Sequence, residues 1–242
     1  MQILSVLSRK GGTGKTTLAV HLAAAAQRSG LNVLLGDMDP QRSALDWSRE
    51  RASMEPAVVE LKPGAMFIGV QQAARAGVSD LMVLDSRSNY DNEAAEAVRY
   101  ADLCMIVVRP CFFDIRAIAR TVELVTNMRK AGLFVINQAP SRRNGEEPRL
   151  IREAVETLES FGLPIAPVGL RYRLAYQNAV RAGLTAQELE PDSPAAFEVN
   201  ALWHHVQREL WPENGAFARP AAHPAARAAK VRPIRELLAE AG

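Results

Sequence analysis

The chain has 242 residues, of which 48% are hydrophobic and 23% are charged, with 15 glycines and 14 prolines. This composition is typical of a globular protein and excludes collagen-like, coiled-coil and largely disordered chains. The 29 basic and 27 acidic residues leave a net charge of +2, so charge alone does not predict a polyanionic partner. No apolar run approaches the roughly 18 to 20 residues that cross a bilayer. Because the first residues also carry no secretory signal, we expect a cytoplasmic protein.

Short runs rich in Val, Ile and Leu alternate with helical patterns along most of the chain. In chain order, these runs predict strands at residues 2–7, 32–35, 57–61, 81–84, 103–108, 133–136 and 165–168. The intervening segments predict helices at residues 15–29, 43–52, 65–76, 92–100, 114–130, 148–161, 172–182 and 195–210. Such a repeat predicts an α/β fold, a mostly parallel twisted sheet with helices on both faces. Ligands of these sheets bind at the carboxyl ends of the strands.

The composition changes after Trp211, where the chain becomes rich in Ala, Pro and Arg. We therefore divide it into one domain at residues 1–212 and a tail at residues 213–242. Near the end of the tail, Ile234, Leu237 and Leu238 fall on one face of a predicted short helix. Three apolar residues bury little area, so we expect a frayed or partner-binding segment here and no stable membrane attachment.

A glycine-rich segment joins the first predicted strand to the first predicted helix. Its glycines let consecutive backbone N–H groups face phosphate oxygens, while Lys15 neutralises the terminal phosphates and Thr16 offers a hydroxyl to Mg²⁺. The usual pattern has a glycine where Arg9 stands, and a second lysine, Lys10, opens the loop. The alternative is a glycine-rich turn without a ligand. A nucleoside triphosphate is predicted to contact Lys10, Gly11, Gly12, Thr13, Gly14, Lys15, Thr16 and Thr17.

Three carboxylates stand at strand ends on the same side of the predicted sheet. Asp37 and Asp39 follow the second predicted strand, and Asp85 closes the fourth. Beside a triphosphate, carboxylates at these places hold the water shell of Mg²⁺ and orient an attacking water. The alternative is that they cap helices or form turns.

The segments from Lys10 to Thr17 and from Asp37 to Gln41 together resemble the ParA/MinD family of deviant-Walker ATPases, across about residues 1–211. The resemblance implies a P-loop NTPase fold with ATP and Mg²⁺ as cofactors. It implies that Lys10 reaches across a nucleotide-sandwich dimer to the partner's phosphates. It further implies that Lys15 and Thr16 are the Walker lysine and a Mg²⁺ ligand, and that Thr17 adds a second hydroxyl.

The same resemblance assigns roles to further residues. Asp37 and Asp85 correspond to metal-side acids, Asp39 positions the hydrolytic water, and Asn137 contacts the adenine base. Arg171 and Arg173 fall in a region where several partitioning relatives carry DNA-contacting arginines. The catalytic set implied by the resemblance is thus Lys10, Lys15 and Asp39. Arg109-Pro110 followed by Asp114 looks like the family's segment after the fifth strand.

The sequence departs from the family pattern at two places. After Asp85 the family often has Thr-Pro-Pro or Gly-Ala-Gly, whereas Ser86-Arg87-Ser88 stands here. Cys111-Phe112-Phe113 replaces a commoner Ser-Pro-Leu type of segment. Neither change touches a predicted phosphate ligand.

The resemblance implies an ATP-dependent dimerising switch that binds DNA non-specifically and positions a plasmid, chromosome locus or other cargo. Its weak ATPase activity would be stimulated by a partner protein, and the protein would associate with the nucleoid. One alternative is a MinD-like, membrane-associated positioning ATPase. Another is a metabolic P-loop enzyme such as an iron–sulfur reductase, which would need paired thiolates at a dimer axis. Of the two cysteines, Cys104 lies inside a predicted strand, where we expect it to be buried.

Overall fold

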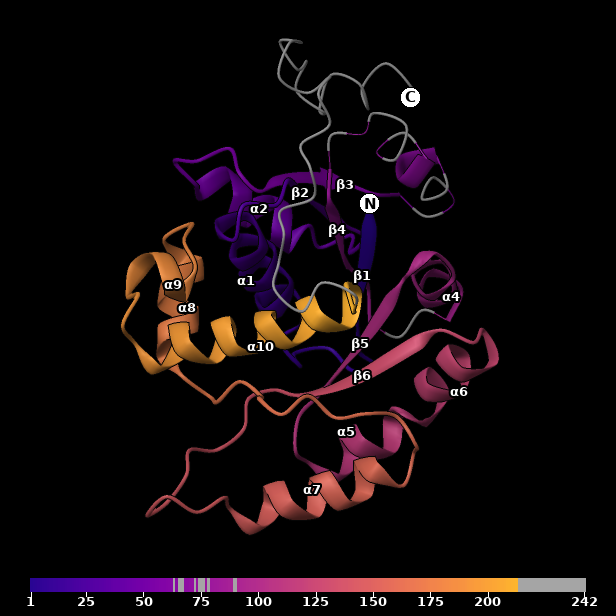
Figure 1. Ribbon diagram of the computed structural model, residues 1–242, viewed down its shortest axis with the longest axis vertical. Coiled ribbons are helices and arrows are strands. Elements are labelled where there is room, and N and C mark those ends of the chain that lie inside the picture. The colour runs from indigo at the N-terminus through magenta and orange to yellow at the C-terminus, as the bar shows by residue number, and fades with distance from the viewer. Residues whose placement is uncertain are drawn as a thin grey trace.

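The computed structural model describes residues 1–62, 64, 68–71, 73, 77, 79–88 and 91–212. Six parallel strands form one sheet in the order β3-β2-β4-β1-β5-β6 (Figure 1). Their bounds are β1 (Gln2–Leu7), β2 (Val33–Asp37), β3 (Ala57–Glu60), β4 (Leu81–Asp85), β5 (Leu103–Val108) and β6 (Ala131–Ile136). The predicted α/β class and the parallel sheet are confirmed.

The central strands are buried on both faces, which explains why their sequences are continuous apolar runs. β1 lies in the middle, between β4 and β5, and the chain leaves it for β2 on one side and later for β5 on the other. Where strand order changes direction in this way, the loops at the carboxyl ends diverge and leave a crevice. The glycine-rich segment that follows β1 therefore opens at this crevice.

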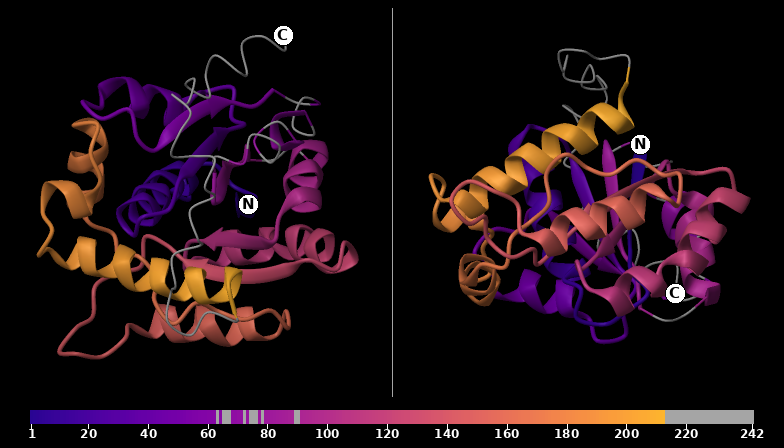
Figure 2. Two further views of the ribbon diagram at one scale, coloured as in Figure 1. Left: turned by 45° about the horizontal axis from the view of Figure 1, so that its top comes forward. Right: turned by 90° about the horizontal axis from the view of Figure 1, so that it is seen from below.

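Helices cover both faces of the sheet, as predicted (Figures 1 and 2). One face packs against α1, α2, α8, α9 and α10, and the other against α4, α5, α6 and α7. The bounds are α1 (Lys15–Arg28), α2 (Ser43–Glu50), α4 (Asp91–Tyr100), α5 (Phe112–Ala117), α6 (Ala119–Asn127), α7 (Arg149–Glu159), α8 (Leu174–Arg181), α9 (Ala186–Leu189) and α10 (Pro194–Leu210). α1 runs back from the crevice along the middle of the first face.

The predicted seventh strand at residues 165–168 is wrong. This segment does run parallel to β6, but the structure records only an isolated bridge between Phe134 and Ile165. The Phe134 and Ile136 carbonyls accept bonds from the N–H groups of Ala166 and Leu170. A regular parallel ladder would bond the Ile136 carbonyl to Val168, two residues after Ala166, but Leu170 donates instead, so two extra residues interrupt the register.

The helix predicted at residues 114–130 is divided into α5 and α6 around Ile118, whose N–H group bonds back three residues to Ile115. The four-residue α9 was not predicted. The helix predicted at residues 65–76 falls largely outside the described residues, although residues 68–71 and 73 are helical. The predicted tail at residues 213–242, with its short helix, lies wholly outside them. Within the described part of the chain, no helix is both long and apolar enough to span a membrane.

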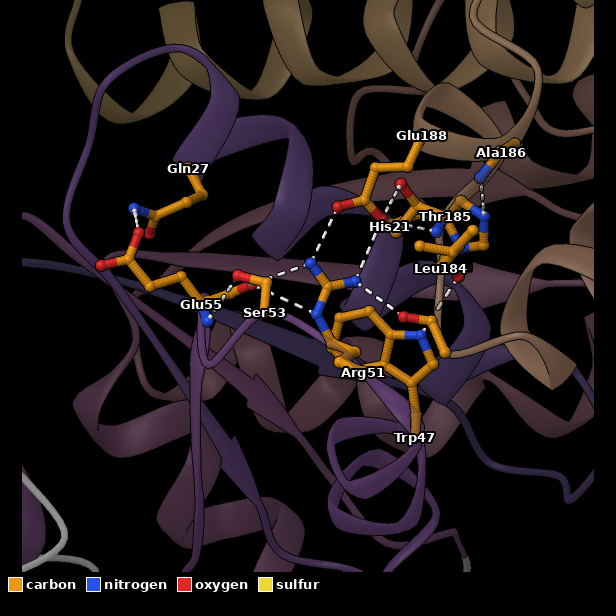
Figure 3. Close-up of polar contacts among 11 residues, drawn as sticks. His21, Gln27, Trp47, Arg51, Ser53, Glu55, Leu184, Thr185, Ala186 and Glu188 are labelled. Atoms are coloured by element: carbon orange, nitrogen blue, oxygen red, sulfur yellow. Dashed lines mark hydrogen bonds and ion pairs between the residues drawn. The ribbon is translucent and has the colours of Figure 1, made fainter.

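A polar network ties α1 to the end of α2 and to α9 (Figure 3). His21 of α1 is fully buried; its Nδ1 lies 2.7 Å from the Thr17 carbonyl, and its Nε2 accepts the Ala186 N–H group at 3.1 Å. Arg51, just after α2, donates to both carboxylate oxygens of Glu188 in α9. Burial lowers the pKa of His21 to about 4. The neutral imidazole therefore connects α1 and α9, two helices that are far apart in the sequence but adjacent in the fold.

Replacing His21 with Gln should flatten the dependence of stability on pH. The folded-state pKa of His21 is about 4, below the ordinary value of 6.5, so the unfolded chain binds a proton first as the pH falls. The free energy of unfolding should therefore drop by about 3 kcal/mol between pH 6.5 and pH 4 on account of this residue. Urea titrations across this range would measure the slope. His204→Gln, at an exposed position, is the control; equal slopes for wild type and His21→Gln would contradict the assignment.

Candidate functional site

The loop between β1 and α1 has the shape that its glycines predict. Gly12 and Gly14 have φ values of 74° and 86°, and Gly14 is the residue before the first turn of α1. A Cβ atom on Gly14 would also lie 2.4 Å from Nδ2 of Asn137. Both the left-handed backbone and the close approach require glycine at this position.

Side chains from other segments hold the carbonyl groups of this loop. Asn137 follows β6, and its Nδ2 donates to the Thr13 carbonyl at 2.7 Å. The next residue, Gln138, donates its Nε2 to the Gly12 carbonyl at 2.9 Å. The Thr13 hydroxyl donates to the hydroxyl of Ser8 at 2.8 Å. These bonds fix the peptide planes of the loop. Asn137 thus lies against the loop in this structure, and its contact with an adenine base stays a prediction.

Lys15, at the start of α1, is buried beneath the loop with 7% of its surface exposed. Its ammonium group donates to the hydroxyl of Ser88, which follows β4. Burial lowers the pKa of Lys15, whereas the carboxylates of Asp85 and Asp39 oppose this shift. The site therefore holds a desolvated cation at the place where the sequence predicts terminal phosphates.

Asp85 ends β4 and is completely buried at the floor of the same crevice. Among the described residues, neither of its carboxylate oxygens accepts a hydrogen bond of ordinary geometry. Burial raises the pKa of Asp85 to about 7, although the neighbouring Thr16 hydroxyl lowers it. An orphaned buried carboxylate beside a hydroxyl fits a site for a divalent cation.

No group of three or more His, Cys, Asp and Glu side chains within the described ranges could hold a metal ion by itself. This fits Mg²⁺, which is usually bound through one or two carboxylates together with substrate phosphates and water. Thr16 and Asp85 are the residues that suit it here.

Asp37 and Asp39 differ in their surroundings. Asp37 lies beside Asp85 in the register of β2 and β4 and is buried. Its carboxylate accepts the N–H groups of Asp39, Ala44 and Leu45 at 3.0 to 3.1 Å, so it caps the first turn of α2. This is the alternative role considered above, and the metal role of Asp37 stays a prediction. Burial raises its pKa, while these three bonds lower it. Asp39 is partly exposed, its Oδ1 accepts the Gln41 N–H group, and its charge acts on Lys15 and Asp85.

Lys10 stands at the rim, with 39% of its side chain exposed. Its Nζ lies 3.6 Å from Asp114 and 5.4 Å from the centre of the Phe113 ring. Arg109 binds the same carboxylate through two bonds, of 2.6 and 3.1 Å. Burial tends to raise the pKa of Asp114, but hydrogen bonds from Arg109 and Cys111 and the charge of Lys10 hold it below its usual range. Lys10 is thus a partly exposed cation whose counter-charge, the buried Asp114 carboxylate, is bound more closely by Arg109.

Arg171 and Arg173 lie away from the loop and are already paired with acids. Arg171 donates to both oxygens of Glu147, and Arg173 donates to Glu198 through two bonds of 2.6 and 3.0 Å. Together with Phe197 of α10, they line a cavity of about 800 Å³ at the β6 edge of the sheet. Both guanidinium groups are therefore already bound by carboxylates of the chain, although Glu147 also binds Arg142, and their contact with DNA stays a prediction.

Three contributors to the site were given no role in it by the sequence analysis. Ser88 and Gln138 carry no local signal, because a serine in a loop and a glutamine after a strand are common at unremarkable positions. Asp114 was noted only through the resemblance. The two cysteines give no sign of a cluster: Cys104 is fully buried and its thiol pKa is raised by burial to about 12.

Comparison with known proteins connects this geometry to one family. A sequence model described as the CobQ/CobB/MinD/ParA nucleotide binding domain matches residues 4–186. The chain is 29% identical over 213 residues to maintenance of carboxysome distribution protein A of Halothiobacillus neapolitanus, covering 84% of this chain and 95% of the relative. It is 31% identical over 219 residues to the protein of the same name from Gloeobacter kilaueensis, covering 86% and 94%.

Among solved structures, the fold is similar to that of the septum site-determining protein MinD from Pyrococcus horikoshii, complexed with Mg-ADP. The TM-score is 0.67 at 19% sequence identity, and the match covers 86% of this chain and 96% of that one. At this identity the likeness supports the fold alone.

Replacing Asp85 with Asn should stabilise the protein in the absence of nucleotide and metal. Because the pKa of Asp85 is raised to about 7, the folded chain loses stability as the pH rises through that value. At pH 8 we expect Asp85→Asn to raise the free energy of unfolding by up to about 4 kcal/mol, and this gain should vanish near pH 4. Denaturant unfolding at pH 8 and pH 4.5 would measure it.

Asp37→Asn is the matched control, because Asp37 is a buried carboxylate that accepts three backbone bonds. We expect this change to give no comparable gain. An Asp85→Asn variant that is less stable than the wild type at pH 8 would show that the carboxylate has a partner in solution.

Proposed function

Because the chain belongs to the CobQ/CobB/MinD/ParA nucleotide-binding family, a family of P-loop ATPases, we propose that it is an ATP-driven dimerising switch that positions a cargo. In this proposal ATP favours a homodimer, the dimer binds DNA non-specifically, and a partner protein stimulates a slow ATPase. The main observation in support of this proposal is that one glycine-rich loop has a buried lysine, Lys15, at its end and a partly exposed lysine, Lys10, at its start.

The residues of the loop divide the work of nucleotide binding. Its backbone N–H groups and the start of α1 face the phosphates, and Lys15 neutralises their charge. Thr16 and Asp85 would hold Mg²⁺, which supplies further positive charge to the phosphates when bound. Asp39, which is partly exposed, is suited to orient a water molecule toward the terminal phosphate. Asp37 holds α2 in place through its three backbone bonds.

Lys10 supplies the link between nucleotide and dimer. Its side chain is 39% exposed, and its Nζ lies 3.6 Å from the buried Asp114 carboxylate, beyond hydrogen-bond distance, whereas Arg109 binds that carboxylate through two closer bonds. A triphosphate on a second copy of the chain is a stronger counter-charge than one carboxylate shared with Arg109. ATP would therefore favour the dimer by its differential interaction with the two states.

The names of two relatives support a positioning role. Both are called maintenance of carboxysome distribution proteins, which describes the placement of an intracellular body. The proposed cargo of this chain is accordingly a plasmid, a chromosome locus or another large body, with the protein itself associated with the nucleoid.

Replacing Lys10 with Ala should separate nucleotide binding from dimerisation. We expect the dissociation constant of the monomer for Mg-ATP to change by roughly three-fold or less, because in this proposal Lys15 neutralises the chain's own phosphates and Lys10 meets those of the second copy. The ATP-dependent dimer should be lost, as measured by light scattering coupled to gel filtration. Lys15→Ala, which removes the buried cation, should instead abolish nucleotide binding. A dimer that persists in Lys10→Ala with ATP would refute the role of Lys10.

Binding to random-sequence duplex DNA tests the proposed nucleoid association. If each subunit of the dimer places Arg171 and Arg173 on phosphates, four contacts give a log–log salt slope of about −3.6. Because Glu147 and Glu198 already hold these arginines, the DNA would have to share them. Fluorescence anisotropy with ATP at several salt concentrations would give the slope, and the double variant Arg171→Gln/Arg173→Gln should reduce it toward zero. An unchanged slope in that variant would show that DNA binds at other residues. If the wild type with ATP does not bind DNA at all, the proposed DNA binding is wrong.

A further inference from the structure

The segment after β4 contains two serines, Ser86 and Ser88, that make different contacts: Ser86 bonds to β1, and Ser88 bonds to the glycine-rich loop. The Ser86 hydroxyl is buried and donates to the Val6 carbonyl at 2.7 Å, which fastens the segment to β1. The Ser88 hydroxyl accepts a hydrogen bond from the Lys15 ammonium and donates to the Lys10 carbonyl at 3.3 Å. One oxygen atom thus joins the residues that open and close the loop.

We propose that Ser88 is a positioning residue of the nucleotide site, which holds the Lys15 ammonium in the orientation that receives the phosphates. The inference rests on the proposed function, because it takes the crevice to be an ATP site. Ser88 acts through Lys15, and no contact between Ser88 and a nucleotide is required.

The need for such a residue follows from the chemistry of lysine. A lysine side chain is a flexible four-carbon chain that ends in three N–H donors, so an unrestrained ammonium group samples many positions. Lys15 is nearly buried, and its nearest carboxylates, Asp85 and Asp39, act on it as charges. The hydrogen bond to Ser88 supplies direction and still leaves two N–H donors for phosphate oxygens.

The loop itself does not depend on Ser88 for its shape. The Lys10 carbonyl also accepts the Ser8 hydroxyl at 3.0 Å and lies 3.4 Å from the Thr13 hydroxyl. Removing the Ser88 hydroxyl therefore leaves that carbonyl satisfied. The group that loses its partner is the ammonium of Lys15, which makes Ser88→Ala a selective change.

The experiment compares Ser88→Ala, Ser88→Thr and Ser86→Ala with the wild type in the full-length chain. Calorimetry with Mg-ATP gives the dissociation constant, and thermal unfolding reports whether each variant is folded. A second measurement needs no nucleotide: the rate at which an acetylating reagent modifies Lys15, followed by mass spectrometry of the peptide that contains it.

We expect Ser88→Ala to weaken Mg-ATP binding by roughly ten-fold, the effect of losing one hydrogen bond to a charged group. Acetylation of Lys15 should become several times faster, because the ammonium is released from a buried contact. Ser88→Thr keeps a hydroxyl and should restore both values. Ser86→Ala should lower the unfolding temperature without changing the affinity or the acetylation rate of Lys15.

Wild-type values for both measurements in Ser88→Ala would overturn the inference. Equal losses in Ser86→Ala and Ser88→Ala would also overturn it, because the effect would then come from the segment as a whole. If the wild-type chain does not take up Mg-ATP, the proposed function fails, while the acetylation comparison still decides whether Ser88 holds Lys15.

Discussion

Two buried charges of opposite sign, the Lys15 ammonium and the Asp85 carboxylate, lie in one crevice beneath the glycine-rich loop. Burying a charge is costly unless it is paired and hydrogen-bonded, and among the described residues the Asp85 carboxylate accepts no hydrogen bond of ordinary geometry. Selection for stability alone would replace such a group. In the function proposed above, a ligand would complete the arrangement, with a cation against Asp85 and an anion against Lys15.

The rest of the fold holds these groups in place. β1 and β4 are adjacent, so the loop after β1 and the acid at the end of β4 meet at one edge of the sheet. Asn137 and Gln138 reach the loop carbonyls from the end of β6, two strands away from β1. The surrounding core supplies the stability that offsets the cost of burying these charges. A rigid scaffold that holds destabilising buried charges in place is typical of a binding site, where function is kept at a cost in stability.

Much of this arrangement was predictable, because it follows from local pattern. Buried parallel strands are continuous apolar runs, and a loop that binds phosphate needs glycines before Lys15, so strands, loop and acids could be placed from the sequence. Contacts between segments that are distant in the sequence could not be predicted in this way. The Ser88 hydroxyl contacts Lys15 only because β1 and β4 are neighbours. The ion pair of Arg171 with Glu147 joins residues on either side of α7, and it depends on the path of the chain between them. The start of α2 at Ser43 was predicted, but not the turn over residues 38–42 that brings the N–H groups of Ala44 and Leu45 to the Asp37 carboxylate.

The interrupted segment beside β6 has a consequence for how the protein behaves at high concentration. The outer edge of a sheet offers N–H and C=O groups to any extended chain that arrives, and adding a foreign strand there begins aggregation. Here the Phe134 and Ile136 carbonyls are already taken by the segment that follows α7. Pro167, whose nitrogen is on the side of that segment away from β6, has no N–H group to offer an arriving strand. The segment that replaces a seventh strand thus disfavours the addition of a further strand at this side of the sheet.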